Sequence, residues 1–355
     1  MTSVSVAMAT FNGARYIREQ LDSLAAQSHL PSELIISDDR STDETLQLVN
    51  DFAAEAPFPV IVHRNDERLG YRANFLLATT FCSSDLIAFC DQDDVWHERK
   101  IEACIPFFNN PEVLLVCHGA IVTAADGRPV GLIDYRNASN VINSPLSTGP
   151  WPFAYGFTQV FRRSLPFLPN LWIGSVDHCR TSERMAHDQW FLFLSSVLGS
   201  VAYIKEPLAR YRQHDSNAMG WGERNAHLID GVRSFFTNFA ERYAGAEAWA
   251  RACADILEQA KGAWDETWSY RASVAAVKYR WLAQRYSNRK ILYTATTSSQ
   301  RLMAFKNILC SGGYRFNDPY SFGPKSLAKD AALGILVGHH LRKYRDAVIG
   351  ADAVH

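Results

Sequence analysis

Three carboxylates in four positions follow an apolar run in the middle of this 355-residue sequence. Asp91, Asp93 and Asp94 come directly after Leu86–Cys90. Like charges this close repel one another, so the group favours a bound cation. Carboxylate oxygens are ligands for hard divalent ions such as Mg²⁺ and Mn²⁺. The cluster therefore predicts a divalent-metal site, with ordinary turn or helix-cap residues as the alternative.

A second acidic pair, Asp38 and Asp39, follows the apolar run 34–37. A carboxylate there can accept a hydrogen bond from a nucleotide base or a ribose hydroxyl, and a turn is again the alternative. The sequence contains neither a P-loop nor a G-x-G-x-x-G motif. If a nucleoside diphosphate binds, we therefore expect a metal ion, and no glycine loop, to neutralise it.

The elements that position these residues alternate between strand and helix patterns. Strands are predicted at 4–8, 34–37, 60–62 and 86–90, with helical patterns between them. A capping box formed by Ser41 and Glu44 is expected to start the second helix. This order predicts a mostly parallel, Rossmann-like α/β sheet with helices on both faces. Ligands bind beyond the carboxyl ends of such strands, where both acidic groups fall.

Later patterns are less regular. A strand is expected at 114–117, a hairpin turn at Asp126-Gly127, and a long aromatic-rich loop over 134–158. From residue 225 to 287 the pattern is helical and rich in alanine. We therefore predict a catalytic domain over residues 1–224 and a mostly helical region over 225–355, with an acceptor, membrane-surface or oligomer role.

Composition limits the class of protein. Its 47% hydrophobic and 21% charged residues indicate a folded protein, and the formal net charge of -1 argues against a nucleic-acid partner. The 7 cysteines are scattered without C-x-x-C spacing, which is typical of reduced thiols. The start of the chain lacks a signal-peptide pattern, and no run reaches the ~20 apolar residues that span a membrane. These features predict a cytoplasmic protein.

Charge is distributed unevenly. Residues 1–224 hold 18 Lys and Arg against 26 Asp and Glu, whereas 225–355 hold 18 against 11. Between 267 and 329, 11 basic residues accompany a single acid, Asp318, and Trp and Tyr are frequent. One interpretation is peripheral docking on anionic lipid. The alternative is a helical subdomain whose Lys and Arg face solvent.

Four motifs in order carry a family resemblance. VSVAMATFNGARYIREQLDSLAAQS, ELIISDDRSTDET, LIAFCDQDDVW and HDQW resemble glycosyltransferase family 2, whose members have the GT-A fold. DQDDVW, HDQW and YRQH together are similar to the bacterial rhamnosyltransferase-like members. The resemblance covers roughly residues 3–220.

The resemblance implies a role for several residues of this chain. Thr10, Asn12 and Asp39 would contact the nucleotide base, and Asp91 would lie near the ribose. Asp93 would ligate the metal, and His214 would complete the metal site. Asp188 would be the general base, although at the start of an apolar helix it could instead be an N-cap.

The implied reaction is inverting, metal-dependent transfer of a sugar, with rhamnose as a candidate, from a nucleoside-diphosphate sugar to a hydroxyl of a surface glycan or lipid-linked glycan. One departure is Arg40, where the family usually has glycine; it either faces solvent or modifies selectivity. Two alternatives are a haloacid-dehalogenase-like phosphatase with Asp91 as nucleophile and a non-catalytic sugar-nucleotide-binding protein. The phosphatase reading lacks its Gly-Asp metal motif.

Overall fold

The computed structural model describes residues 2–135, 139–178, 180–215, 217 and 239–337. The chain divides into two compact units: Met1–Pro169 with Met185–Trp221, and Asn170–Arg184 with Gly222–His355. The predicted boundary at residue 224 lies outside the described residues. Residues 170–184, which fall within the predicted catalytic range, belong to the second unit.

The first half of the first unit is the predicted parallel sheet. Its strands lie in the order β3 (Val60–Arg64), β2 (Glu33–Asp38), β1 (Val4–Thr10) and β4 (Leu86–Cys90), all parallel. Every residue of β1, β2 and β4 is buried, as their apolar sequences require of strands covered on both faces.

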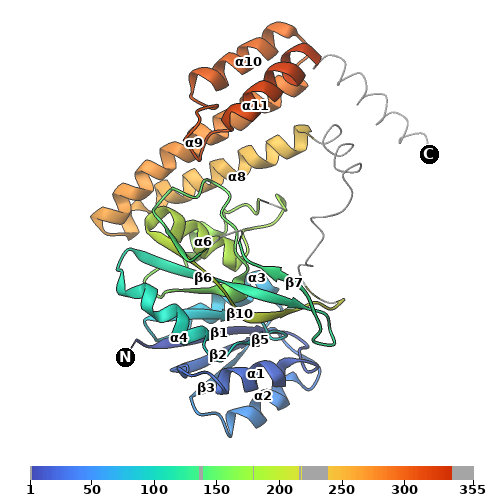
Figure 1. Ribbon diagram of the computed structural model, residues 1–355, viewed down its shortest axis with the longest axis vertical. Coiled ribbons are helices and arrows are strands. Elements are labelled where there is room, and N and C mark those ends of the chain that lie inside the picture. Colours follow the sequence, from blue (N-terminus) through green and yellow to red (C-terminus); the bar gives the residue numbers. More distant parts are fainter. Residues whose placement is uncertain (1, 136–138, 179, 216, 218–238, 338–355) are drawn as a thin grey trace, which may run out of the picture. The chain divides into compact units, whose positions relative to one another are not determined.

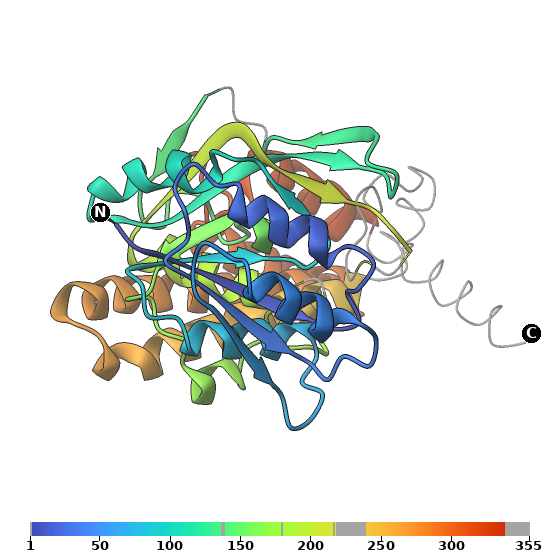
Figure 2. The same ribbon diagram turned by 90° about the horizontal axis from the view of Figure 1, so that it is seen from below.

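Helices cover both faces of this sheet. The connecting helices are α1 (Ile17–Ala25), α2 (Thr45–Ala53) and α3 (Tyr71–Thr80). Figure 2 shows α1 and α2 side by side on the near face of the sheet. In Figure 1 they lie below the strands, whereas α6 (His187–Leu198), which contacts α3, lies above them. The α/β fold class is as predicted.

The second half of the sheet is mixed, which the sequence patterns did not reveal. Beyond β4 the order continues β9 (Gln159–Arg162), β6 (Val113–Thr123), β10 (Ser200–Arg212) and β5 (Val95–Trp96). Strand β9 runs antiparallel to both β4 and β6. The region between β5 and β6 forms α4 (Lys100–Cys104) and the 3₁₀ helix η1 (Ile105–Asn109).

The predicted hairpin is present, with Gly127 at a φ of 84° between β6 and β7 (Pro129–Ile133). The expected loop over 134–158 contains a short strand, β8 (Val141–Asn143), which pairs with β10, and the 3₁₀ helix η2 (Gly156–Thr158). Of the aromatic residues in this segment, Tyr155 lies against Phe157 and Tyr211, whereas Trp151 is exposed.

The second unit is mostly helical, as expected. Helices α8 (Phe239–Ala260) and α9 (Glu266–Thr294) pack along each other, and α10 (Ser298–Cys310) packs on α9. The described part of the unit also contains four short elements: α5 (Pro169–Trp172), the 3₁₀ helix η4 (Lys261–Ala263), α11 (Gly323–Lys329) and the π-helix η5 (Asp330–Val337). No helix among the described residues is both long and apolar enough to cross a bilayer.

A buried ion pair lies at the centre of this helical unit. Asp330 is fully buried and accepts hydrogen bonds from Arg289 at 2.9 Å, Tyr293 at 2.7 Å and Tyr314 at 2.8 Å. Two hydroxyls and one guanidinium therefore satisfy a carboxylate that would otherwise be costly to bury. The pair joins η5 to α9.

We predict that Asp330→Asn destabilises the second unit by about 3–5 kcal/mol, because a buried guanidinium loses its counter-charge. Hydrogen exchange of α9 amides in the full chain measures the loss. The matched control is Asp255→Asn on α8, an exposed carboxylate, which should change stability by less than about 0.5 kcal/mol. Equal exchange in the two variants would contradict the assignment.

A neutral histidine lies in the aromatic core of the first unit. The His187 ring stacks on Phe75 with centroids 4.0 Å apart and meets the edge of Phe89 at 4.7 Å. Neither ring nitrogen has a hydrogen-bond partner among the described residues. Burial, and secondarily Arg72, lowers the pKa of His187 to about 3.

This depressed pKa predicts acid sensitivity. The unfolded chain binds a proton on His187 below about pH 6.5, whereas the folded chain does not until about pH 3. The associated stability is therefore complete above pH 6.5 and lost on acidification, by about 2 kcal/mol from pH 7 to pH 5. The free energy of unfolding, measured by urea titration, should therefore fall by that amount more in the wild type than in His187→Leu between pH 7 and pH 5. A pH-independent difference would rule this out.

Candidate active site

Antiparallel pairing of β5 with β10 brings two distant motifs together. Ala209 pairs with Trp96 and Arg210 with Val95. The segment that follows β4 is thereby joined to the segment that ends β10. As a result Asp93 Oδ2 lies 2.8 Å from His214 Nε2, although the two residues are 121 positions apart. The two residues assigned to the metal from the sequence thus meet in space.

Both partners of this contact are held in place. The His214 ring stacks on Tyr16 with centroids 4.9 Å apart, and its backbone N–H donates to Asn217 Oδ1 at 2.6 Å. Only 18% of the Asp93 side chain is exposed. A carboxylate oxygen and an imidazole nitrogen that lie this close together are a pair of ligand types suited to a divalent cation such as Mn²⁺. Within the described ranges, no group of three or more His, Cys, Asp or Glu side chains is placed to hold a metal.

Asp94 has a different role from its neighbours. It is fully buried, and its Oδ1 accepts from the Arg212 N–H at 3.1 Å. Burial, with the charges of Asp93 and Asp91, raises the pKa of Asp94 well above its ordinary value. We therefore assign Asp94 to the architecture of the loop.

Arg212 organises the site and was not identified from the sequence. Its Nε donates to the Asp93 carbonyl at 3.0 Å, its guanidinium forms an ion pair with Glu19, and it lies over the Tyr16 ring. Arg212 therefore fixes the backbone that carries Asp93.

Asp91 and Asp188 lie within electrostatic reach of each other. Burial is the largest cause that raises the pKa of Asp91 to about 8, followed by the charges of Asp93 and Asp188; Lys100 opposes the shift. Asp188 is the second residue of α6, and its Oδ1 accepts from the Gln189 N–H at 2.8 Å. The N-cap of this helix is Ala186, so Asp188 is not the N-cap that the sequence left open.

The residues expected near the nucleotide base already bind protein groups. Thr10 donates its hydroxyl to Asp38 at 3.0 Å, and Asn12 Oδ1 accepts from the Thr42 N–H at 2.8 Å. Asp39 accepts from the backbone N–H groups of Leu69 at 2.7 Å and Gly70 at 2.8 Å, and from the Asn65 amide at 3.1 Å. These contacts bring the loops after β1, β2 and β3 together at the carboxyl edge of the sheet.

The capping box predicted for α2 is wrong. The helix begins at Thr45, and Glu44 makes no side-chain cap. The Ser41 hydroxyl instead donates to the buried Asp38 carboxylate and accepts from the Asn12 N–H at 3.0 Å. A buried charge needs these donors more than a helix end does, because the helix end can be solvated.

Gln92, the residue between the two metal-motif aspartates, binds the loop after β1. Its Oε1 accepts from the Phe11 N–H at 3.0 Å, and its Nε2 donates to the Phe11 carbonyl at 3.1 Å. A Cβ at Gly13 would lie 2.3 Å from Gln92 Oε1, so that position admits only glycine without rearrangement. The amide thus fixes the spacing between the two loops.

Arg40 is exposed and has a φ of 67°, a backbone region that favours the glycine usual at this position of the family. Its Nη1 donates to the Asp66 carbonyl at 2.6 Å. Of the two sequence interpretations, the structure agrees with a solvent-facing side chain, here tied to the loop after β3.

Comparisons with known proteins relate the first part of this chain to one family. Residues 5–165 match the family described as glycosyl transferase family 2. An uncharacterized glycosyltransferase of Nostoc sp. is 25% identical over 226 residues, 60% of this chain and 66% of the relative, just under two thirds of it. The dTDP-rhamnosyl transferase RfbG of Shigella flexneri is 29% identical over 60% of this chain and 73% of its own length.

Among solved structures, S. aureus TarS 1-349 in complex with UDP-GlcNAc aligns with a TM-score of 0.49 at 16% identity, covering 89% of this chain and 93% of that one. The family match favours a transferase over the phosphatase alternative. Over residues 5–165 the chain is therefore similar to glycosyl transferase family 2, and its first unit has the mixed α/β fold with a mostly parallel central sheet.

Proposed function

We propose that this protein transfers a sugar from a nucleoside-diphosphate sugar to a hydroxyl of a surface glycan, with inversion at the anomeric carbon and with Mg²⁺ or Mn²⁺. The observation that carries the proposal is the 2.8 Å contact between Asp93 and His214. Asp91 is close enough to both Asp93 and Asp188 for their charges to raise its pKa. An acid pair, an imidazole and a further carboxylate at one sheet edge are what such a reaction requires.

In this proposal Asp93 and His214 hold the cation, and the donor diphosphate and water supply the remaining ligands, as is common for Mg²⁺. When bound, the cation would stabilise the negative charge on the departing diphosphate. Asp91, Asp39, Thr10 and Asn12 bind the nucleoside. Their existing bonds leave capacity for this, since a carboxylate oxygen accepts more than one hydrogen bond, the Thr10 hydroxyl can still accept one, and the Asn12 amide nitrogen can still donate.

Asp188 takes the proton from the acceptor hydroxyl as that oxygen attacks the anomeric carbon. The bond to the diphosphate breaks on the opposite side of the sugar, which accounts for inversion. The first turn of α6 orients the carboxylate through the Gln189 N–H.

The sugar and the acceptor are further parts of the proposal. Similarity to a dTDP-rhamnosyl transferase supports rhamnose as the donor sugar. We propose a lipid-linked surface glycan as acceptor, reached by a cytoplasmic protein bound peripherally to the inner face of the membrane. A thermal-shift panel of nucleoside diphosphates with Mn²⁺ tests the donor class, because a ligand at 100 times its Kd stabilises by about 2.7 kcal/mol.

Asp93→Asn should remove the metal dependence of nucleotide binding, because the amide keeps the shape but loses the charged ligand. We expect Mn²⁺ to bind at least about 10-fold more weakly in the presence of the best nucleoside diphosphate from the panel. Isothermal titration calorimetry measures this. Asp51→Asn, which removes an exposed carboxylate from α2, is the matched control. Wild-type Mn²⁺ dependence in Asp93→Asn would refute the metal assignment.

Asp188→Asn should separate chemistry from binding. Affinity for the same nucleoside diphosphate and Mn²⁺ should stay near wild type, while kcat for sugar transfer falls on the order of 10²-fold or more. Transfer is measured as nucleoside diphosphate released from the sugar donor that the panel selects. If kcat stays within a few-fold of wild type, the base lies elsewhere.

A further inference from the structure

One face of α10 exposes apolar side chains that a helix in a folded unit normally buries. Leu302, Met303 and Leu309 are 57%, 59% and 50% exposed, and Phe316, just beyond the helix, is 77% exposed. Leu302, Lys306 and Leu309 follow the i, i+4, i+7 spacing of a single helical face. The opposite side packs inward through Ala304 and Ile308, which are buried.

Cations accompany this apolar surface. Lys306 lies on the same face, and the Arg315 side chain lies over Gly312 at the end of the helix, with its Nε 2.7 Å from the position of a Gly312 Cβ. Neither side chain has an ion-pair partner among the described residues, and Lys325 on α11 has none there either. We call Leu302, Met303, Lys306, Leu309, Arg315 and Phe316 the α10 face.

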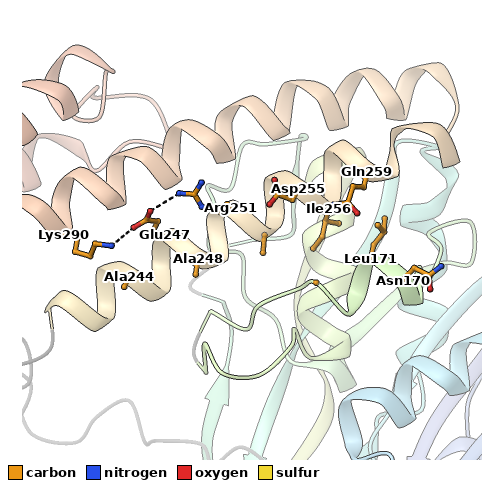
Figure 3. A pocket seen from close by; sticks show the side chains of 12 residues that line it. Asn170, Leu171, Ala244, Glu247, Ala248, Arg251, Asp255, Ile256, Gln259 and Lys290 are labelled. Atoms are coloured by element: carbon orange, nitrogen blue, oxygen red, sulfur yellow. Dashed lines mark hydrogen bonds and ion pairs between the residues drawn. The ribbon is translucent and has the colours of Figure 1, made fainter.

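Most other cations of this unit are already engaged. Figure 3 shows Lys290 and Arg251 both paired with Glu247 along a cavity of about 510 Å³, each at 3.0 Å. Arg280 pairs with Glu258 at 3.4 Å. Three more are buried: Arg285, Arg289 and Arg301. Among the described residues of this unit, the basic excess counted from the sequence therefore leaves a few available cations, and two of them lie on the α10 face.

Helix α9 offers a competing surface. Tyr270, Val274, Val277 and Trp281 are exposed at i, i+4, i+7 and i+11. The cations beside it are occupied, since Lys278 lies over the Tyr320 ring and Arg280 pairs with Glu258. Tyr279, Tyr286 and Tyr293, which also lie in the aromatic and basic stretch 267–329, are buried. This stripe therefore combines apolar area with cations that already have a partner in the fold.

We propose that the α10 face is the surface by which this protein docks on an anionic membrane, an inference that rests on the proposed lipid-linked acceptor. Apolar side chains interleaved with unpaired cations fit the boundary between lipid headgroups and acyl chains. Leu302, Leu309 and Phe316 enter that boundary, while Lys306 and Arg315 contact lipid phosphates. A purely apolar partner would leave both cations without counter-charges.

Vesicle co-sedimentation of the full chain tests the charges. The wild type should bind vesicles of equal parts phosphatidylglycerol and phosphatidylcholine but not phosphatidylcholine alone, and high salt should release it. Each cation near the membrane surface raises the affinity for anionic vesicles about 5-fold. The double variant Lys306→Gln, Arg315→Gln should therefore bind them about 25-fold more weakly. The matched control removes two paired cations, Arg251→Gln with Arg280→Gln. Equal weakening in both double variants would overturn the assignment.

A second measurement tests the apolar part. Leu302→Gln with Leu309→Gln should also lose anionic-vesicle binding, whereas Trp281→Gln on α9 should keep it. A fluorophore on Cys310, with Cys179→Ser as background, should shift to the blue on vesicle binding, because Cys310 is the exposed cysteine among the described residues. Loss of binding in Trp281→Gln alone, or an unshifted fluorophore, would overturn the proposal.

Two further outcomes separate the possibilities. Light scattering measures the oligomeric state. If the wild type is a dimer and the double variant Leu302→Gln, Leu309→Gln is a monomer, the α10 face binds a second copy of the chain and membrane docking is refuted. Calorimetry of Mn²⁺ and nucleoside diphosphate on the same samples reports the catalytic unit alone. Intact nucleotide binding without vesicle binding would therefore reject the α10 face and leave the proposed transfer reaction standing.

Discussion

Repulsion among three carboxylates at the end of one buried strand is the constraint on which the first unit depends. Two unit charges about 4 Å apart interact by roughly 4 kcal/mol at the effective dielectric of a protein surface. Cationic side chains from other elements lie close to these carboxylates and hold the loop in place. Arg212 binds the backbone of this loop, and Lys100, fully buried on α4, lies 3.3 Å from the Trp96 ring centroid and donates to the Phe157 carbonyl at 2.6 Å.

The groups around the three aspartates also give each of them a different environment. Asp94 is turned inward and bound by the Arg212 N–H, so it stabilises the loop. Asp93 remains partly exposed beside His214. Asp91 keeps a raised pKa because burial and two neighbouring carboxylates act together. A motif that looks like three equivalent ligands in the sequence is therefore one structural residue and two residues available for chemistry.

Much of the first unit was predictable because its signals are local. Buried parallel strands appear as apolar runs, and the turn at Gly127 appears as Asp-Gly. The antiparallel insertion of β9 between β4 and β6 has no such signal, since a short apolar segment does not encode which strand it will join. The same holds for the Gln92 amide bound to the Phe11 backbone and for the role of Arg212, which depend on contacts between residues 81 and 119 positions apart.

The exposed positive charge of the second unit was the property least predictable from the sequence, and the reason is physical. An arginine counts as +1 wherever it lies, but a buried arginine paired with a carboxylate contributes less to the potential outside the protein than an exposed, unpaired one. In the second unit Arg289 is neutralised inside the fold by Asp330, and Arg285 donates to the Tyr320 carbonyl at 3.0 Å. In a basic stretch of sequence, many arginine side chains can thus form ion pairs and hydrogen bonds inside the fold. The few cations left over then determine where an anionic partner can bind, and their position depends on how the helices pack, which the charge count does not contain.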